Sequence, residues 1–263
     1  MPTTPRNTPL VTLEIDGAIA TITLNRPEKC NALSMGVIHE LQECFAGLPG
    51  SVRAAILNGA GTHFSAGLDL SELADTSTAE GIQQSLAWYE AFSRIQFGRV
   101  PVVAVLHGAV VGGGLELAST LHVRIAEESA YFGLPEGQRG IFLGGGGSVR
   151  IAKLIGFSRV TEMMLTGHVL DAREAHASGL VHYVTPPGAG LAKARALAER
   201  IAGNAPMSNF SILNALPLIA EQPMSHGLFT EALMAAIAQG EPAAKERLQA
   251  FLQKRAAKVM PGH

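Results

Sequence analysis

The chain of 263 residues has little of what several protein classes require. Its two cysteines, Cys30 and Cys44, form no Cys-x-x-Cys pair, which excludes a disulfide framework and a zinc site built from several thiolates. Charged residues make up only 16% and the net charge is −2, so the chain lacks the basic surplus with which proteins follow a phosphate backbone. We therefore expect no nucleic-acid partner and no bound metal.

Long apolar runs and a secretory signal are lacking as well. The longest apolar stretch, residues 100–111, is interrupted by His107 and Gly108 and is shorter than the ~20 residues that span a bilayer. Residues 1–9 are polar and contain no apolar segment of the kind found in signal peptides. These features predict a cytoplasmic protein that does not bind a membrane.

Aromatic residues are scarce at 5%, whereas glycine is abundant with 29 copies. The glycines are concentrated in two runs, residues 112–114 and residues 144–147. Glycine serves where a backbone turns sharply or must come close to a ligand. Both runs are therefore candidates for a binding site.

Strand and helix patterns alternate over most of the chain. Residues 11–15 and 20–24 are β-rich and flank Asp16-Gly17, which predicts a hairpin. The continuous apolar runs at residues 54–57 and 102–106 are typical of strands buried on both faces. After Pro186-Pro187 the pattern becomes almost wholly helical. We predict an α/β fold with a core at residues 1–187 and a helical region at residues 188–263.

The first glycine run directly precedes a short helical pattern at residues 115–120. The N–H groups that open a helix lack helical partners, and such groups can stabilise the oxyanion that forms from a substrate carbonyl. Residues 65–68, which follow a predicted strand, could supply a second N–H group. The alternative is that both segments are ordinary tight turns.

Two carboxylates lie close to these segments. Glu116 falls in the first turn of the predicted helix, where it could simply stabilise the helix dipole, and Glu136 falls in a turn that could be exposed to solvent. Together with two candidate oxyanion donors, they indicate proton transfer next to a carbonyl group. Arg139 is near Glu136 in sequence and would favour its charged form.

Taken in order, a series of segments resembles the crotonase superfamily, which comprises enoyl-CoA hydratases and isomerases. The segments are residues 24–28, 31–33, 64–70, 111–118, 132–136, 165–167, 171–172, 179–181 and 250–255. The resemblance implies a spiral of ββα units that forms two sheets, followed by a C-terminal helical trimerisation region. It also implies a homotrimer, or a homohexamer made of two trimers.

The resemblance further implies a role for individual residues. An acyl-CoA thioester would place its carbonyl oxygen between the N–H groups of Leu68 and Gly113. Glu116 would activate the water that adds at Cβ, and Glu136 would deliver the proton to Cα. The residues expected at the substrate and coenzyme A are Arg26, Ala66, Leu68, Asp69, Leu70, Gly112 and Gly113. Coenzyme A is part of the substrate, so no separate cofactor is expected.

Other readings remain open beside hydration of a 2-enoyl-CoA. They are isomerisation, thioester hydrolysis or retro-aldol cleavage of an acyl-CoA, and a non-catalytic scaffold or RNA-binding relative. The dienoyl-CoA isomerase branch has an additional acid where this chain has Gly144. The presence of both glutamates and the net charge of −2 favour the hydratase.

Overall fold

The computed structural model describes residues 8–72 and 76–253, and chain contacts divide it into two compact units, residues 1–202 and 203–263. The strands are β1 (Val11–Asp16), β2 (Ile19–Leu24), β3 (Ala54–Gly59), β4 (Val102–Leu106), β5 (Ala109–Val111), β6 (Val123–Glu127), β7 (Tyr131–Gly133), β8 (Val169–Asp171) and β9 (Tyr183–Thr185). The α-helices of the first unit are α1 (Met35–Ala46), α2 (Thr78–Gln96), α3 (Gly113–Ala118), α4 (Gly147–Ile155), α5 (Phe157–Thr166), α6 (Ala172–Ala177) and α7 (Gly190–Ala202). Short 3₁₀ turns lie at Pro27–Lys29, Leu70–Glu72 and Gly137–Arg139.

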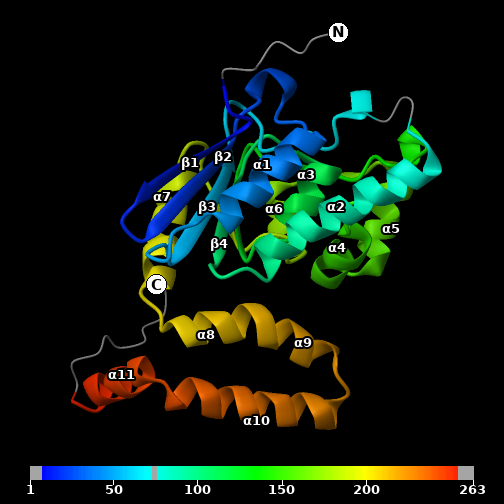
Figure 1. Ribbon diagram of the computed structural model, residues 1–263. Coiled ribbons are helices and arrows are strands. Elements are labelled where there is room, and N and C mark those ends of the chain that lie inside the picture. The colour runs from blue at the N-terminus through cyan, green and yellow to red at the C-terminus, as the bar shows by residue number, and fades with distance from the viewer. Residues whose placement is uncertain (1–7, 73–75, 254–263) are drawn as a thin grey trace. The chain divides into compact units, whose positions relative to one another are not determined.

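Two sheets form the first unit (Figure 1). The larger sheet has the order β1-β2-β3-β4-β6-β9, in which β1 and β2 form the predicted antiparallel hairpin and the other neighbours run parallel. The smaller sheet has the order β5-β7-β8. The chain passes from the larger sheet to the smaller one twice, after β4 and after β6, so the loops that follow β5 and β7 come together.

The pairing of β5 with β7 places the two predicted carboxylates near each other. These strands are parallel, and their last residues, Val111 and Gly133, are register partners. The N–H of Gly112 donates to the carbonyl of Gly133 at 2.9 Å just beyond that point. Because the carboxyl ends of parallel strands meet at one edge, the segments that carry Glu116 and Glu136 leave the sheet side by side.

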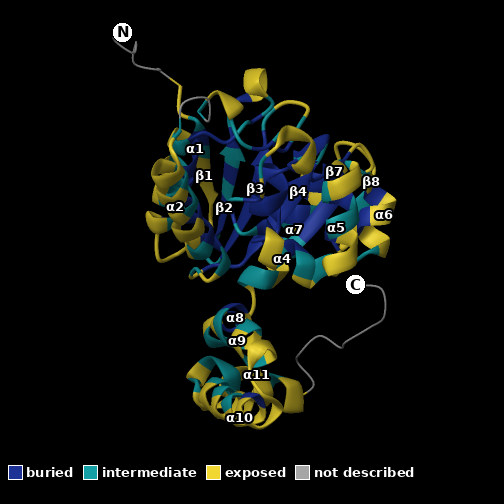
Figure 2. Ribbon diagram, turned by 90° about the vertical axis from the view of Figure 1, so that its right-hand side faces the viewer, coloured by how far each residue is buried: buried dark blue, intermediate teal, exposed yellow. Residues whose placement is uncertain are grey.

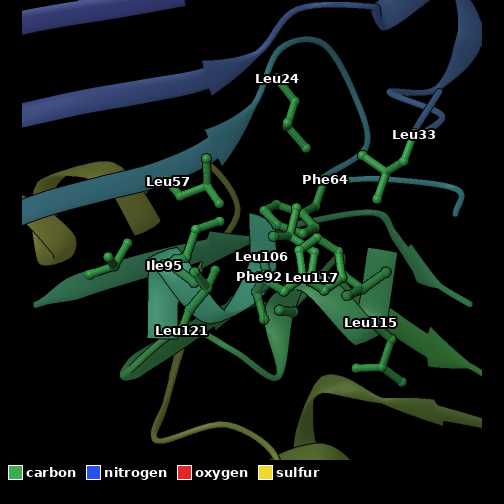
Figure 3. Packing of buried hydrophobic residues seen from close by; sticks show 14 of the residues in the cluster. Leu24, Leu33, Leu57, Phe64, Phe92, Ile95, Leu106, Leu115, Leu117 and Leu121 are labelled. Atoms are coloured by element: carbon green, nitrogen blue, oxygen red, sulfur yellow. The ribbon is translucent and has the colours of Figure 1, made fainter. Parts of the chain in front are cut away.

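The core of the first unit lies between the sheets and their covering helices. The strands β2, β3, β4 and β6 of the larger sheet are largely buried, whereas most of β1 and the outward faces of α1 and α2 are exposed (Figure 2). Leu57, Phe64, Leu106 and Leu117 pack together in its interior (Figure 3). Leu117 belongs to α3, so the helix that carries Glu116 is anchored in this core and is held rigidly.

The boundary between the units lies later in the chain than the sequence predicts. We expected it between residues 187 and 188, at the double proline, but α7 belongs to the first unit. Its Ala194 and Ala198 are fully buried in a cluster with side chains of the larger sheet, and α7 packs against β3, β4 and β6. The double proline therefore ends the strand region without ending the unit.

The second unit is helical, as predicted for the end of the chain. It contains α8 (Pro206–Phe210), a π-helical turn at Ser211–Ala215, α9 (Leu216–Glu221), α10 (Met224–Gly240) and α11 (Pro242–Leu252). Large apolar side chains of α10 are exposed, among them Leu228, Phe229, Leu233 and Ile237. No helix in the described ranges is both long enough and apolar enough to cross a membrane.

Candidate active site

The first unit contains a cavity of about 170 Å³ at the ends of β5 and β7. Four residues selected from the sequence line it, namely Leu68, Gly113, Glu116 and Glu136. Helix α2 and the segment that follows Glu136 contribute the rest of the wall. The structure thus brings together both predicted carboxylates and both predicted oxyanion donors.

Glu116 is buried on α3 and is held by backbone N–H groups. Its Oε1 accepts hydrogen bonds from the N–H groups of Gly145 and Gly147, each at 2.8 Å. Burial raises the pKa of Glu116, while these two donors and the charge of Arg150 act in the opposite direction. Burial is the largest of these effects, so the pKa of Glu116 is raised overall, which makes the carboxylate a stronger base. The two N–H groups hold its Oε1 in place, so this glutamate is equipped to accept a proton.

Arg150 of α4 holds the loop that donates hydrogen bonds to Glu116. Its Nη1 donates to the carbonyl oxygen of Gly145 at 2.9 Å, and its Nε donates to Oε1 of Gln96 at 2.7 Å. The guanidinium therefore links the end of α2 to the loop whose N–H groups hold Glu116. Arg150 has no contact with the predicted substrate position, so we regard it as a positioning residue.

Glu136 follows β7 and is in a different environment. It is buried rather than exposed on a loop, and its Oε2 has no hydrogen-bond partner among the described residues. Burial raises the pKa of Glu136 to about 7, and the negative charge of Glu116 acts in the same direction. The exposed Arg139 lowers that pKa, as expected from the sequence, but its effect is smaller than that of burial. Glu136 is thus suited to carry a proton near neutral pH.

The N–H groups of Leu68 and Gly113 belong to residues that line the same cavity. Neither donates a hydrogen bond to another described residue. A Cβ atom built on Gly113 would lie 3.2 Å from the Leu68 nitrogen and 2.9 Å from the indole ring of Trp88. Only glycine at this position leaves room for a carbonyl oxygen between the two donors.

Gly112 is required for another reason. Its φ of +52° is in the region that side-chain-bearing residues rarely adopt, and an added Cβ would lie 2.9 Å from Oε1 of Glu136. This turn directs the chain from β5 into α3 while Glu136 packs close behind it. The alternative of an ordinary tight turn does not explain the close approach of Glu136.

Arg26 and Asp69 form an ion pair at 3.0 Å, and Nη1 of Arg26 also donates to the carbonyl oxygen of Ala32 at 2.8 Å. Hydrogen bonding by the Ser71 hydroxyl, together with Arg26, lowers the pKa of Asp69. The guanidinium is buried and is engaged within the protein, so both residues position the turn that carries Leu68. Contact of either residue with coenzyme A stays a prediction.

Ala66 and Leu70 lie on either side of the Leu68 turn. The N–H of Ala66 donates to the carbonyl oxygen of Cys30 at 2.9 Å, which fixes the start of the turn. Leu70 is 44% exposed, so it is accessible to a large ligand such as coenzyme A. Contact of Ala66 and Leu70 with coenzyme A stays a prediction.

Several residues of the site were not identified from the sequence. The helix pattern at α2 gave no sign that Gln84, Ser85 and Trp88 face the cavity, because period alone does not reveal what a helix face touches. Trp88 is the single tryptophan of the chain, which is the one signal that could have drawn notice to it. The glycine run at residues 144–147 was recognised, but its role as a donor to Glu116 was not. Among the described residues, no group of His, Cys, Asp or Glu side chains is arranged to hold a metal ion.

The fold and the cavity together define an α/β protein with paired N–H donors and two buried carboxylates around one small binding space. Residues 14–260 match the family model described as enoyl-CoA hydratase/isomerase. The chain therefore belongs to the enoyl-CoA hydratase/isomerase family, which confirms the resemblance recognised in the motifs.

Named relatives and solved structures agree with this assignment. A short-chain-enoyl-CoA hydratase from Clostridium acetobutylicum is 35% identical over 201 residues, which cover 75% of this chain and 77% of the relative. A 2,3-dehydroadipyl-CoA hydratase from Escherichia coli is 33% identical, covering 89% of this chain and 92% of the relative. A crystal structure from Rhodopseudomonas palustris, described as an enoyl-CoA hydratase, has a TM-score of 0.91 and 50% identity over 95% of this chain and 97% of that one. The predicted crotonase-type fold is thereby confirmed.

Proposed function

We propose that this chain adds water across the 2,3 double bond of a 2-enoyl-CoA thioester. The observation that carries the proposal is the contrast between two carboxyl groups in one cavity. Burial raises the pKa of both groups, that of Glu136 to about 7. Oε1 of Glu116 accepts hydrogen bonds from two backbone N–H groups, whereas Oε2 of Glu136 has no hydrogen-bond partner among the described residues. A hydration needs one group that accepts a proton and one that delivers a proton, and this pair supplies both.

The reaction uses the four residues as follows. The thioester carbonyl oxygen accepts hydrogen bonds from the Leu68 and Gly113 N–H groups, which stabilise the enolate. Glu116 takes a proton from water as the water oxygen bonds to Cβ. Protonated Glu136 delivers its proton to Cα, so the double bond is replaced by new C–O and C–H bonds. Transfer of the proton from Glu116 back to Glu136 through water restores the starting state.

A substrate panel tests this proposal against the other family reactions. Crotonyl-CoA should lose its enone absorbance and yield 3-hydroxybutyryl-CoA, because the pair is set up for addition of water. A 3-enoyl-CoA that is converted faster than crotonyl-CoA would instead identify an isomerase. Release of free coenzyme A from either compound would identify a hydrolase.

The assembly and location of the protein are part of the same proposal. We propose that three or more copies associate, because α10 exposes Leu228, Phe229, Leu233 and Ile237, and exposed apolar patches of this kind are typical of interfaces. Met234 of the same helix is partly buried. A cytoplasmic location remains our expectation, consistent with two cysteines that are free.

A further inference from the structure

The wall of the cavity formed by α2 contains polar groups that the hydration does not use. Gln84 and Ser85 line the cavity together with Trp88, which is one helical turn further along. Neither the amide of Gln84 nor the hydroxyl of Ser85 forms a hydrogen bond with another described residue, and both residues are partly buried. Neither polar group is engaged within the described part of the chain, so both are available to a ligand in the cavity.

The Ser85 hydroxyl lies close to the loop that holds Glu116. A Cβ atom built on Gly144 would lie 3.3 Å from the Ser85 hydroxyl, and the next residue, Gly145, donates to Glu116. Consecutive Cα atoms are about 3.8 Å apart, so the Ser85 hydroxyl lies near Glu116, and Gln84 lines the same cavity. An acyl chain that extends past the double bond therefore reaches them.

The size and charge of the cavity limit what the acyl chain can be. Its volume of about 170 Å³ is close to the ~150 Å³ of an engineered cavity that holds benzene, which corresponds to a chain of about six carbons. No lysine or arginine lines the cavity, and two glutamates do. A terminal carboxylate would lie in the same cavity as the proton acceptor Glu116, without a cation in the cavity wall to pair with, which is unfavourable in a buried site.

We propose that the enzyme is specific for a short 2-enoyl-CoA whose acyl chain carries an uncharged hydrogen-bonding group, such as a hydroxyl, which Gln84 and Ser85 bind. The inference rests on the proposed function only in that the occupant is an acyl-CoA thioester. Gln84 can donate and accept, and the Ser85 hydroxyl can do the same, so the pair satisfies both the hydrogen and the oxygen of an alcohol. A purely alkyl chain would leave both groups unpaired.

Binding can be measured apart from catalysis, because the single tryptophan of the chain, Trp88, lines this cavity. Hexanoyl-CoA, 6-hydroxyhexanoyl-CoA and adipyl-CoA have no double bond to hydrate, and their dissociation constants follow from titration of tryptophan fluorescence. We expect 6-hydroxyhexanoyl-CoA to bind about fivefold to tenfold more tightly than hexanoyl-CoA, as one or two net hydrogen bonds provide. Adipyl-CoA should bind more weakly than both.

Substitutions assign the preference to the two side chains. Gln84→Leu combined with Ser85→Ala should abolish or reverse the preference for the hydroxyl, while Gln83→Leu, an exposed neighbour outside this cavity, should preserve it. Equal affinities in the unmodified protein, tighter binding of hexanoyl-CoA, or a hydroxyl preference that survives the double substitution would overturn the proposal.

The matching 2-enoyl-CoA compounds separate this proposal from the proposed function. If the hydroxyl preference in binding is present but no 2-enoyl-CoA is hydrated, the specificity stands and the hydratase assignment fails. If hydration occurs but 2-hexenoyl-CoA and 6-hydroxy-2-hexenoyl-CoA have the same kcat/KM and their saturated analogues the same affinity, the hydratase assignment stands and the specificity proposal is overturned.

Discussion

Glu116 and Glu136 line one cavity, but their carboxyl groups differ in the hydrogen bonds that they accept. Oε1 of Glu116 accepts hydrogen bonds from two backbone N–H groups, whereas Oε2 of Glu136 is buried with no partner among the described residues. Hydrogen-bond donors favour the charged form of a carboxyl group, and a buried carboxyl oxygen that accepts no hydrogen bond favours the protonated form. Burial raises the pKa of both groups, and the difference in hydrogen bonding favours Glu116 as the proton acceptor and Glu136 as the proton donor.

Replacement of either glutamate by glutamine should lower kcat for crotonyl-CoA by about 10²–10⁴-fold, because each removes one partner of a proton transfer. The double variant should be little slower than the slower single variant, since residues that act as a unit are not additive. Glu199→Gln on the exposed face of α7 is the matched control and should retain full activity. Near-normal turnover by Glu136→Gln, with circular dichroism showing a folded protein, would contradict the assignment.

The raised pKa of Glu136 predicts a pH dependence of activity and stability. As the pH rises through about 7 the free enzyme loses the proton on Glu136, so kcat/KM should fall above that pH. Between its usual pKa of 4.5 and about 7 the folded state holds a proton that the unfolded state has lost. Stability should therefore decrease over that window, by up to about 3 kcal/mol from this group.

The same linkage makes Glu136→Gln more stable than the unmodified protein at pH 8, with little difference below pH 4.5. Its thermal midpoint, compared with that of Glu199→Gln at both pH values, measures the effect. If the difference in thermal midpoint between Glu136→Gln and Glu199→Gln is the same at pH 4.5 and at pH 8, Glu136 does not titrate in this window.

Arg150→Met should lower kcat by about tenfold and change KM little, because it removes the guanidinium that bonds to Gly145 and favours the charged form of Glu116. Without that charge the pKa of Glu116 should rise, so the acidic limb of the kcat/KM profile should shift to higher pH. Arg150→Lys should restore part of the shift. Arg159→Met, an exposed arginine on α5, is the control, and loss of activity without any change in pH profile would show a merely structural role.

The exposed apolar side chains of α10 predict that the protein in solution is a trimer or a larger assembly. Light scattering should give a mass of at least three times 27.5 kDa. Replacement of Phe229 and Leu233 by charged residues should reduce that mass, because charge is excluded from apolar interfaces. A clean monomer for the unmodified protein would refute the proposed assembly.

Local sequence signals predicted much of the fold. The Asp16-Gly17 turn between two β-rich runs was sufficient for the first hairpin, and uninterrupted apolar runs marked β3 and β4 as buried strands. The boundary of the first unit was not predicted, because the packing of Ala194 and Ala198 on the larger sheet joins α7 to strands far away in sequence. A double proline reports a local break and carries no information on such contacts.

The sequence likewise predicted some parts of the candidate site and missed others. Glu116 and Glu136, Leu68 and Gly113 were found because their motifs are local and keep the order of a known family. The bonds from Gly145 and Gly147 to Glu116 span 29 and 31 residues, and the α2 wall with Trp88 lies in a segment without any motif. These parts depend on how the smaller sheet and α2 enclose the cavity, which only the folded chain shows.

The most direct test of the central claim is the reaction of crotonyl-CoA with the enzyme in D₂O, followed by mass spectrometry and proton NMR of the product. We predict 3-hydroxybutyryl-CoA with one deuterium on Cα, delivered by Glu136, and an oxygen from the solvent on Cβ. Recovery of crotonyl-CoA without hydration, or its conversion to a 3-enoyl-CoA without addition of water, would contradict the account.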